Sequence, residues 1–236
     1  MNKIINFILD IIFPKQCLQC GQDDLWLCNK CFEKINLLNK QTCPICRIKN
    51  NGETCKKCTS HSNLDGLLVA TSLNEQLIQK LIHNFKYKYI TDLRYPLSKL
   101  LLKTFNKYLN NDIKLKSEQY VFIPMPLYKK RLLERGFNQS NLLASSIAKK
   151  TNSPYNPNII YRGKNTETQT KLSRKERILN VKSAFKINKS LDFINKNVII
   201  IDDVATTLST LEECAEILKK AGVKKIWGLV IARGDL

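Results

Sequence analysis

The sequence predicts an α/β protein in which helices flank a parallel sheet, with a small metal-binding module at the amino terminus. Two apolar runs, residues 120–123 and 198–201, have the length and composition of strands buried on both faces of such a sheet. Segments with helical periodicity surround both runs. Regularly spaced cysteine pairs near the amino terminus indicate the module.

Length and charge limit the possible functions. The 236 residues provide for one domain of ordinary size and a small module. The formal net charge is +19, and it remains about +15 if cysteine thiolates hold two Zn²⁺ ions. Such an excess predicts a polyanionic partner, nucleic acid first. A basic surface that serves only solubility is the alternative.

Residues 1–14 are expected to form a short helix that ends at Pro14. Its apolar residues recur at helical spacing: Ile5, Ile8, Leu9 and Ile12. The segment lacks the cleavage site of a signal peptide, and no stretch is apolar for long enough to span a bilayer. We expect a cytoplasmic protein whose first helix docks on its own body. Attachment to the inner face of the membrane is the alternative.

Residues 15–62 are expected to form a double zinc ribbon. They contain four Cys-x-x-Cys pairs, which are Cys17 and Cys20, Cys28 and Cys31, Cys43 and Cys46, and Cys55 and Cys58. Two pairs complete a tetrahedral four-sulfur site that leaves no position for water, as in structural zinc sites. Pairing in chain order gives two short ribbons, and pairing the first with the third also suits the spacing. Two Zn²⁺ ions are expected, with an iron–sulfur cluster or disulfides as alternatives.

A polar stretch over residues 59–66 places a domain boundary there, so that residues 63–236 form the second domain. A strand is expected over residues 67–73, followed by helical periodicity over residues 74–109 with a break near Pro96. Residues 85–89 alternate aromatic side chains with lysines. We favour an ordinary helix end for them, and stacking on unpaired bases is the alternative.

The strand expected over residues 120–126 ends abruptly. Pro124 and Pro126 cannot continue a ladder and favour an extended or cis turn. Basic residues follow at once, among them Lys129, Arg131 and Arg135. Because strand ends meet at one edge of a parallel sheet, these cations are expected opposite the end of the run 198–201. A pyrophosphate group needs such cations together with Mg²⁺.

Asp202 and Asp203 follow the run 198–201 directly, at the strand end where parallel sheets bind ligands. A hydroxyl-rich turn comes next, and Ser209 or Thr210 is the expected cap of the helix after it. A helix N-terminus favours a phosphate group. A buried strand that ends on a solvated acid pair is the plainer interpretation.

This stretch resembles the phosphoribosyl pyrophosphate (PRPP) motif of type I phosphoribosyltransferases, in which an acid pair precedes a Thr-Thr-Gly-x-Thr loop. Leu208 stands where that family usually has Gly. The resemblance implies a type I phosphoribosyltransferase-like fold that binds PRPP with Mg²⁺, with Asp202 and Asp203 facing the ribose hydroxyls. It implies that the 5′-phosphate is held by Ala205, Thr206, Thr207, Leu208, Ser209 and Thr210.

Two further motifs resemble the ComF family of competence-related proteins, which also carries an amino-terminal zinc ribbon. They are Ile-Pro-Met-Pro-Leu-Tyr-Lys-Lys-Arg-Leu-Leu-Glu-Arg-Gly-Phe-Asn-Gln-Ser, from residue 123, and Arg-Gly-Lys-Asn-Thr-Glu-Thr-Gln, from residue 162. By this resemblance the second motif begins a flap over the ligand. Pyrophosphate or flap contacts are implied for Pro124, Met125, Pro126, Lys129, Arg131, Arg135, Asn138, Gln139, Arg162, Gln169, Arg174 and Arg177.

Three functions remain open at this point. We favour ComF-like handling of single-stranded DNA during natural transformation, with PRPP or a nucleotide as ligand and competence DNA-transport proteins as partners. An active, Mg²⁺-dependent phosphoribosyltransferase with an unidentified acceptor is the second, and Leu208 argues against it. A non-catalytic interaction protein is the third.

Overall fold

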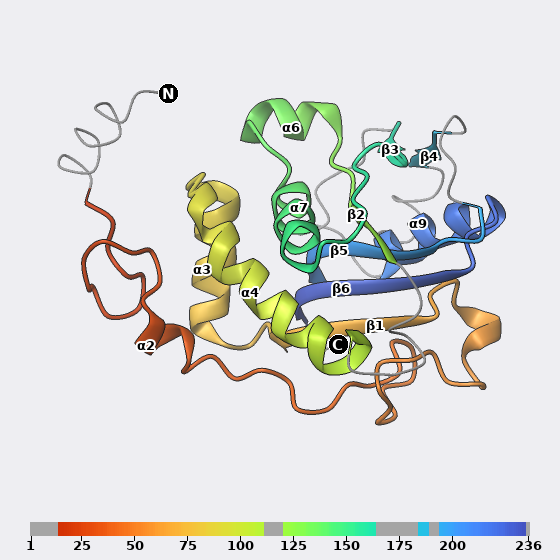
Figure 1. Ribbon diagram of the computed structural model, residues 1–236, viewed down its shortest axis with the longest axis horizontal. Coiled ribbons are helices and arrows are strands. Elements are labelled where there is room, and N and C mark those ends of the chain that lie inside the picture. The colour runs from red at the N-terminus through yellow and green to blue at the C-terminus, as the bar shows by residue number, and fades with distance from the viewer. Residues whose placement is uncertain (1–13, 111–119, 164–183, 189–193, 235–236) are drawn as a thin grey trace.

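The computed structural model describes residues 14–110, 120–163, 184–188 and 194–234, so the helix expected at the amino terminus lies outside the described residues. The main sheet has four strands in the order β1-β6-β5-β2, and each neighbouring pair is parallel (Figure 1). These strands are β1 (Gly66–Ser72), β2 (Tyr120–Pro124), β5 (Asn197–Ala205) and β6 (Lys225–Arg233). The predicted parallel sheet is therefore confirmed.

Helices cover both faces of this sheet (Figure 1). One face carries α3 (Gln76–Tyr87), α4 (Arg94–Phe105) and α7 (Gln139–Thr151). The other face carries α9 (Ser209–Lys220) and an antiparallel pair of short strands, β3 (Ile160–Arg162) and β4 (Phe185–Ile187).

The remaining helices are short. They are α2 (Asn29–Phe32), α6 (Lys129–Arg135), 3₁₀ turns at Thr59–His61 and Thr91–Leu93, and a π-helical turn at Asn106–Asn110. None of the helices in the described ranges is long and apolar enough to cross a membrane.

The centre of the sheet explains why the run 198–201 is apolar without interruption. Successive side chains of a strand point to opposite faces. Ile199 and Ile201 pack against α3, α4 and α7, whereas Val198 and Ile200 pack against α9. All four side chains are fully buried, so a polar residue at any of these positions would lie in a hydrophobic core.

Residues 38–52, part of the predicted zinc-ribbon segment, cover the outer edge of β1. Leu38 N–H donates to Ala70 O at 2.9 Å, and the Gln41 side chain exchanges two 2.9 Å hydrogen bonds with the backbone of Val69. Gly52 accepts from Leu67 N–H at 2.8 Å with φ of +90°, and a Cβ there would lie 2.8 Å from Leu67 O. These contacts protect an edge strand from pairing with other chains.

The helical stretch 74–109 breaks between Tyr87 and Arg94, close to the expected place. Pro96 itself lies in the first turn of α4, where its missing N–H costs no helical hydrogen bond. One local prediction was wrong. The basic segment after β2, expected as a turn, forms the helix α6. The bonds before Pro124 and Pro126 are trans, since the described residues contain no cis peptide.

Candidate functional site

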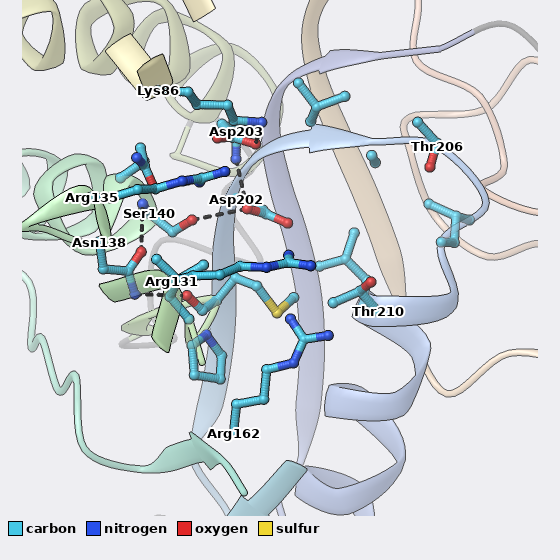
Figure 2. Close-up of a pocket in the computed structure, with 18 of the residues that line it drawn as sticks. Lys86, Arg131, Arg135, Asn138, Ser140, Arg162, Asp202, Asp203, Thr206 and Thr210 are labelled. Carbon is cyan, nitrogen blue, oxygen red and sulfur yellow. Dashed lines mark hydrogen bonds and ion pairs between the residues drawn. The ribbon is translucent and has the colours of Figure 1, made fainter. Parts of the chain in front are cut away.

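An acid pair at the end of β5 lies on one wall of a cavity of about 270 Å³ (Figure 2). Asp203 is buried, and its Oδ1 forms an ion pair with Lys86 Nζ at 2.8 Å. Lys86 belongs to the last turn of α3, more than 100 residues away in sequence. Asp202 instead accepts a 2.9 Å hydrogen bond from Ser140 Oγ, at the start of α7.

The environment of Asp202 alters its ionisation. Burial first, and the charge of Asp203 second, raise the pKa of Asp202 from 3.8 to about 7, although Lys86 and Ser140 oppose the change. Between these two values the native state holds a proton that the unfolded chain has lost. The free energy of unfolding therefore falls as the pH rises from 3.8 to about 7, because Asp202 ionises less easily in the native state. A bound cation next to the carboxylate would reduce this loss of stability.

Three arginines reach into the same cavity: Arg131 and Arg135 from α6, and Arg162 from the end of β3 (Figure 2). Burial first, and the proximity of Arg131 second, lower the pKa of Arg162, and the nearby Asp202 opposes this change. Together with Lys86, the cavity has four cations against the two carboxylates. Among the described residues its lining is thus net positive, which suits an anionic ligand.

The turn between α6 and α7 is fixed by Asn138. Its Oδ1 accepts from Ser140 N–H at 3.0 Å and caps α7, while its Nδ2 donates to Met125 O at 3.0 Å. The next side chain, Gln139, accepts from Arg135 at 3.2 Å. The buried Nε2 of Gln139 has no hydrogen-bond partner in the described part of the chain, so it is available to an acceptor on a ligand.

The loop after the acids leads into α9. The expected side-chain cap was wrong, because Leu208 occupies the N-cap position without a capping side chain and Ser209 is the first helical residue. Leu208 has φ of +64°, in the left-handed region where Gly is favoured. Its side chain is only 6% exposed and packs in the core with Leu211. Burial therefore offsets the backbone strain that Gly would avoid.

Most of the site residues implied by the sequence lie on this one cavity. Those in the lining are Met125, Pro126, Arg131, Arg135, Asn138, Gln139, Arg162, Asp202, Asp203, Ala205, Thr206, Thr207, Leu208 and Thr210. Pro124, Lys129 and Ser209 do not line it. Gln169, Arg174 and Arg177 lie outside the described residues. Lys86, Tyr87 and Ser140 line the cavity and were not among the predicted site residues.

The cysteines gather in two clusters, paired in chain order. The first contains Cys17, Cys20, Cys28 and Cys31, and the second contains Cys43, Cys46, Cys55 and Cys58. Within each cluster all sulfur atoms lie within 4.8 Å of one another. Two of the S···S distances are 3.7 and 3.6 Å, close to the roughly 3.8 Å that tetrahedral Zn–S bonds of about 2.3 Å require. The donors therefore fit one Zn²⁺ ion in each cluster.

Backbone N–H groups support the thiolate form of one cysteine in each cluster. Cys28 N–H donates to Cys17 Sγ, and Cys55 N–H donates to Cys43 Sγ, each at 3.5 Å. Burial raises the pKa of Cys17 and Cys43, but these and neighbouring N–H donors outweigh it and bring both values to about 6. Thiolates are the form that binds zinc.

The second cluster is joined to the elements around the acid loop. Glu212, in the first turn of α9, accepts from Ser62 Oγ at 2.6 Å and from Asn63 N–H at 2.8 Å. Buried Arg233, which pairs with Ala205 in the sheet, donates to Pro44 O at 2.7 Å. The metal-binding module therefore contacts α9, which follows the loop, and β6, which pairs with the strand that precedes the loop.

This chain resembles a known domain family and several known proteins. A model of the phosphoribosyl transferase domain matches residues 135–234. Competence protein F of Haemophilus influenzae is 43% identical over 113 residues, a match that spans 47% of this chain and about half (49%) of that protein. Competence protein ComFC of Bacillus subtilis is 27% identical over 94% of this chain and 91% of its own length. DNA utilization protein YhgH of Escherichia coli K12 is 27% identical over 86% of this chain and 89% of its own length.

A solved hypoxanthine phosphoribosyltransferase from Staphylococcus aureus is 15% identical, covers 67% of this chain and 71% of its own, and has a TM-score of 0.37. A likeness this distant carries no further argument. The family match and the sheet topology define the second part of the chain as a type I phosphoribosyltransferase domain. ComFC and YhgH match most of the length of this chain, and together with the domain match they support its assignment to the ComF family.

The left-handed conformation of Leu208 predicts an unusual order of stabilities. Leu208→Ala keeps the strain and loses the buried side chain, so it should cost about 2–4 kcal/mol of unfolding free energy. Leu208→Gly loses the same packing but relieves the strain, and it should be more stable than the Ala variant by roughly 0.5–1 kcal/mol. Urea unfolding of the three proteins measures both differences. A Gly variant less stable than the Ala variant, as at ordinary helical positions, would contradict the assigned backbone conformation.

Proposed function

We propose that the cavity binds PRPP together with Mg²⁺, and that the protein acts in DNA uptake or utilisation, where it handles single-stranded DNA. The observation that carries the proposal is the convergence of an acid pair, a helix-initiating loop and three arginines on one cavity. The ligand that needs all three is a sugar bearing vicinal hydroxyls, a terminal phosphate and a pyrophosphate.

Each part of PRPP then has a counterpart. Carboxylates accept hydrogen bonds from ribose hydroxyls, which assigns Asp202 and Asp203 to the sugar. The backbone N–H groups of the loop and the first turn of α9 suit the 5′-phosphate. Arg131, Arg135 and Arg162 suit the pyrophosphate, because guanidinium groups bind phosphate oxygens in pairs.

Mg²⁺ fits the same arrangement. It prefers oxygen ligands from one or two carboxylates and from phosphates. Asp202 and Asp203 are the carboxylates that line the described cavity. The metal would neutralise pyrophosphate charge during any displacement at the ribose carbon, while the arginines hold the leaving group and the acids orient the sugar.

The role in DNA metabolism is proposed from the relatives and from charge. The names of the H. influenzae and B. subtilis relatives refer to competence, and that of the E. coli relative refers to DNA utilization. A net charge of +19 provides the electrostatic attraction that nucleic acid requires.

PRPP with Mg²⁺ should raise the melting temperature of the protein. A ligand at 100 times its Kd adds about 2.7 kcal/mol to the free energy of unfolding. Asp202→Asn combined with Asp203→Asn should abolish the rise, because it removes both carboxylate charges, on which Mg²⁺ and the ribose hydroxyls depend. The matched control is Glu213→Gln with Glu216→Gln, which removes the same charge from α9 outside the cavity lining and should keep the rise. Equal stabilisation of the wild type and the doubly substituted acid-pair variant would refute the assignment of the acid pair.

Binding of single-stranded DNA should weaken steeply as salt is added, because each phosphate contact releases counterions. Fluorescence anisotropy with a labelled oligothymidylate measures log K against log[salt], and the slope should be about −0.7 for each phosphate contacted. A slope near zero, or no binding at low salt, would remove single-stranded DNA from the proposed function.

A further inference from the structure

A basic surface with exposed aromatic side chains borders the cavity. We call residues 86–89, at the end of α3, and residues 128–135, which include α6, the rim. Tyr87 and Tyr89 are 49% and 55% exposed, and Leu133 is 84% exposed. Helix α6 buries none of its residues, so its apolar side chains lack the packing that usually accompanies a surface helix.

Two contacts join the halves of the rim into one surface. Tyr89 Oη donates to the backbone oxygen of Glu134 at 3.3 Å. The guanidinium of Arg135 lies 5.3 Å from the centre of the Tyr87 ring, a cation–π distance. Because Tyr87, Arg131 and Arg135 also line the cavity, the rim is continuous with the site proposed for PRPP.

The rim is strongly basic. Its two segments contain six cations, Lys86, Lys88, Lys129, Lys130, Arg131 and Arg135, and one carboxylate, Glu134. Its aromatic residues are Tyr87, Tyr89 and Tyr128, and two of these are about half exposed. Cations that follow a phosphate backbone, interleaved with aromatic faces on which bases stack, are the two components of sites for single strands. A duplex keeps its bases stacked internally, so it could use only the cations.

We propose that the rim is the surface on which single-stranded DNA lies, with unpaired bases stacked on Tyr87 and Tyr89 at the entrance to the PRPP cavity. This inference rests on the proposed binding of single-stranded DNA and assigns it to α3 and α6 instead of the zinc ribbons. The lysines of α6 contact phosphates, and the exposed leucines of α6 cover the edges of neighbouring bases.

The test compares tyrosines that are equally exposed. Tyr89→Ala and Tyr87→Ala should each weaken binding of labelled oligothymidylate at least about fivefold, the lower limit for loss of one stacked base. Tyr161→Ala is the matched control, because Tyr161 is 50% exposed and lies outside the rim. Arg162, the next residue of the strand, lines the cavity, and neighbouring strand residues point to opposite faces, so Tyr161 points away from the cavity. This control variant should bind as the wild type does. Since all three side chains lie on the surface, the variants should melt near the wild-type temperature.

A second pair of variants compares the rim with the ribbons at equal charge. Lys129→Gln with Lys130→Gln should make the slope of log K against log[salt] less negative by about 1.4. Each phosphate that is no longer neutralised accounts for about 0.7 of this change. Lys56→Gln with Lys57→Gln removes two exposed cations from the second ribbon and should leave the slope unchanged.

The outcomes separate the inference from the proposed function. If wild-type protein binds single strands and the tyrosine and lysine variants of the rim bind equally well, the assignment of the binding site to the rim is wrong. The proposed binding of single-stranded DNA is then retained. Equal losses from the rim lysines and the ribbon lysines would also overturn the rim as the site. If the wild type does not bind at all, the proposed function itself fails.

Discussion

Two neighbouring carboxylates at the end of a buried strand repel each other, and much of the site can be understood from the groups that offset this repulsion. Asp203 has the ammonium of Lys86 at 2.8 Å, and Asp202 has the hydroxyl of Ser140 at 2.9 Å. The balance is incomplete, since the pKa of Asp202 stays near 7. A ligand that brings a divalent cation and hydroxyl donors to these acids would offset the remaining repulsion, which supports the proposal of PRPP with Mg²⁺ over a plain anion.

The metal-binding module also contacts the elements that surround the acid pair. It covers the edge of β1, and it contacts α9 through Glu212 and the end of β6 through Arg233. Burial and the nearby Arg47 lower the pKa of Arg233 to about 10, and the charge of Cys43 opposes this. The thiolates of a zinc site would thus compensate a buried guanidinium that lies next to the acid loop. Metal binding would then stabilise the sheet edge and the loop together.

The sequence was informative where one local pattern determines the structure. The apolar run 198–201 predicted the central strand, because a strand covered on both faces needs no polar residue. The spacing of the cysteine pairs predicted the clusters, although only the structure selected the chain-order pairing. The motif that begins with Arg162 predicted a flap, and this prediction is untested because most of the motif lies outside the described residues.

Interactions between distant segments could not be predicted in this way. Nothing near Lys86 in the sequence indicates that it pairs with Asp203, because that contact depends on how α3 packs against the sheet. The aromatic and basic pattern of residues 85–89 was visible, but its place beside the cavity was not. The cap of α9 was mispredicted for a local reason: hydroxyl residues are the preferred caps, and here packing of Leu208 prevails over that preference.

The central claim is that proximity and burial hold Asp202 partly protonated until a ligand arrives. NMR of protein labelled with ¹³C at the aspartate carboxyl carbons measures this directly. One resonance, absent from Asp202→Asn, should titrate with a midpoint near 7 and should move to lower pH when Mg²⁺ and PRPP are added. A midpoint near 4 for that resonance in the free protein, or no change on addition of the ligand, would contradict the account.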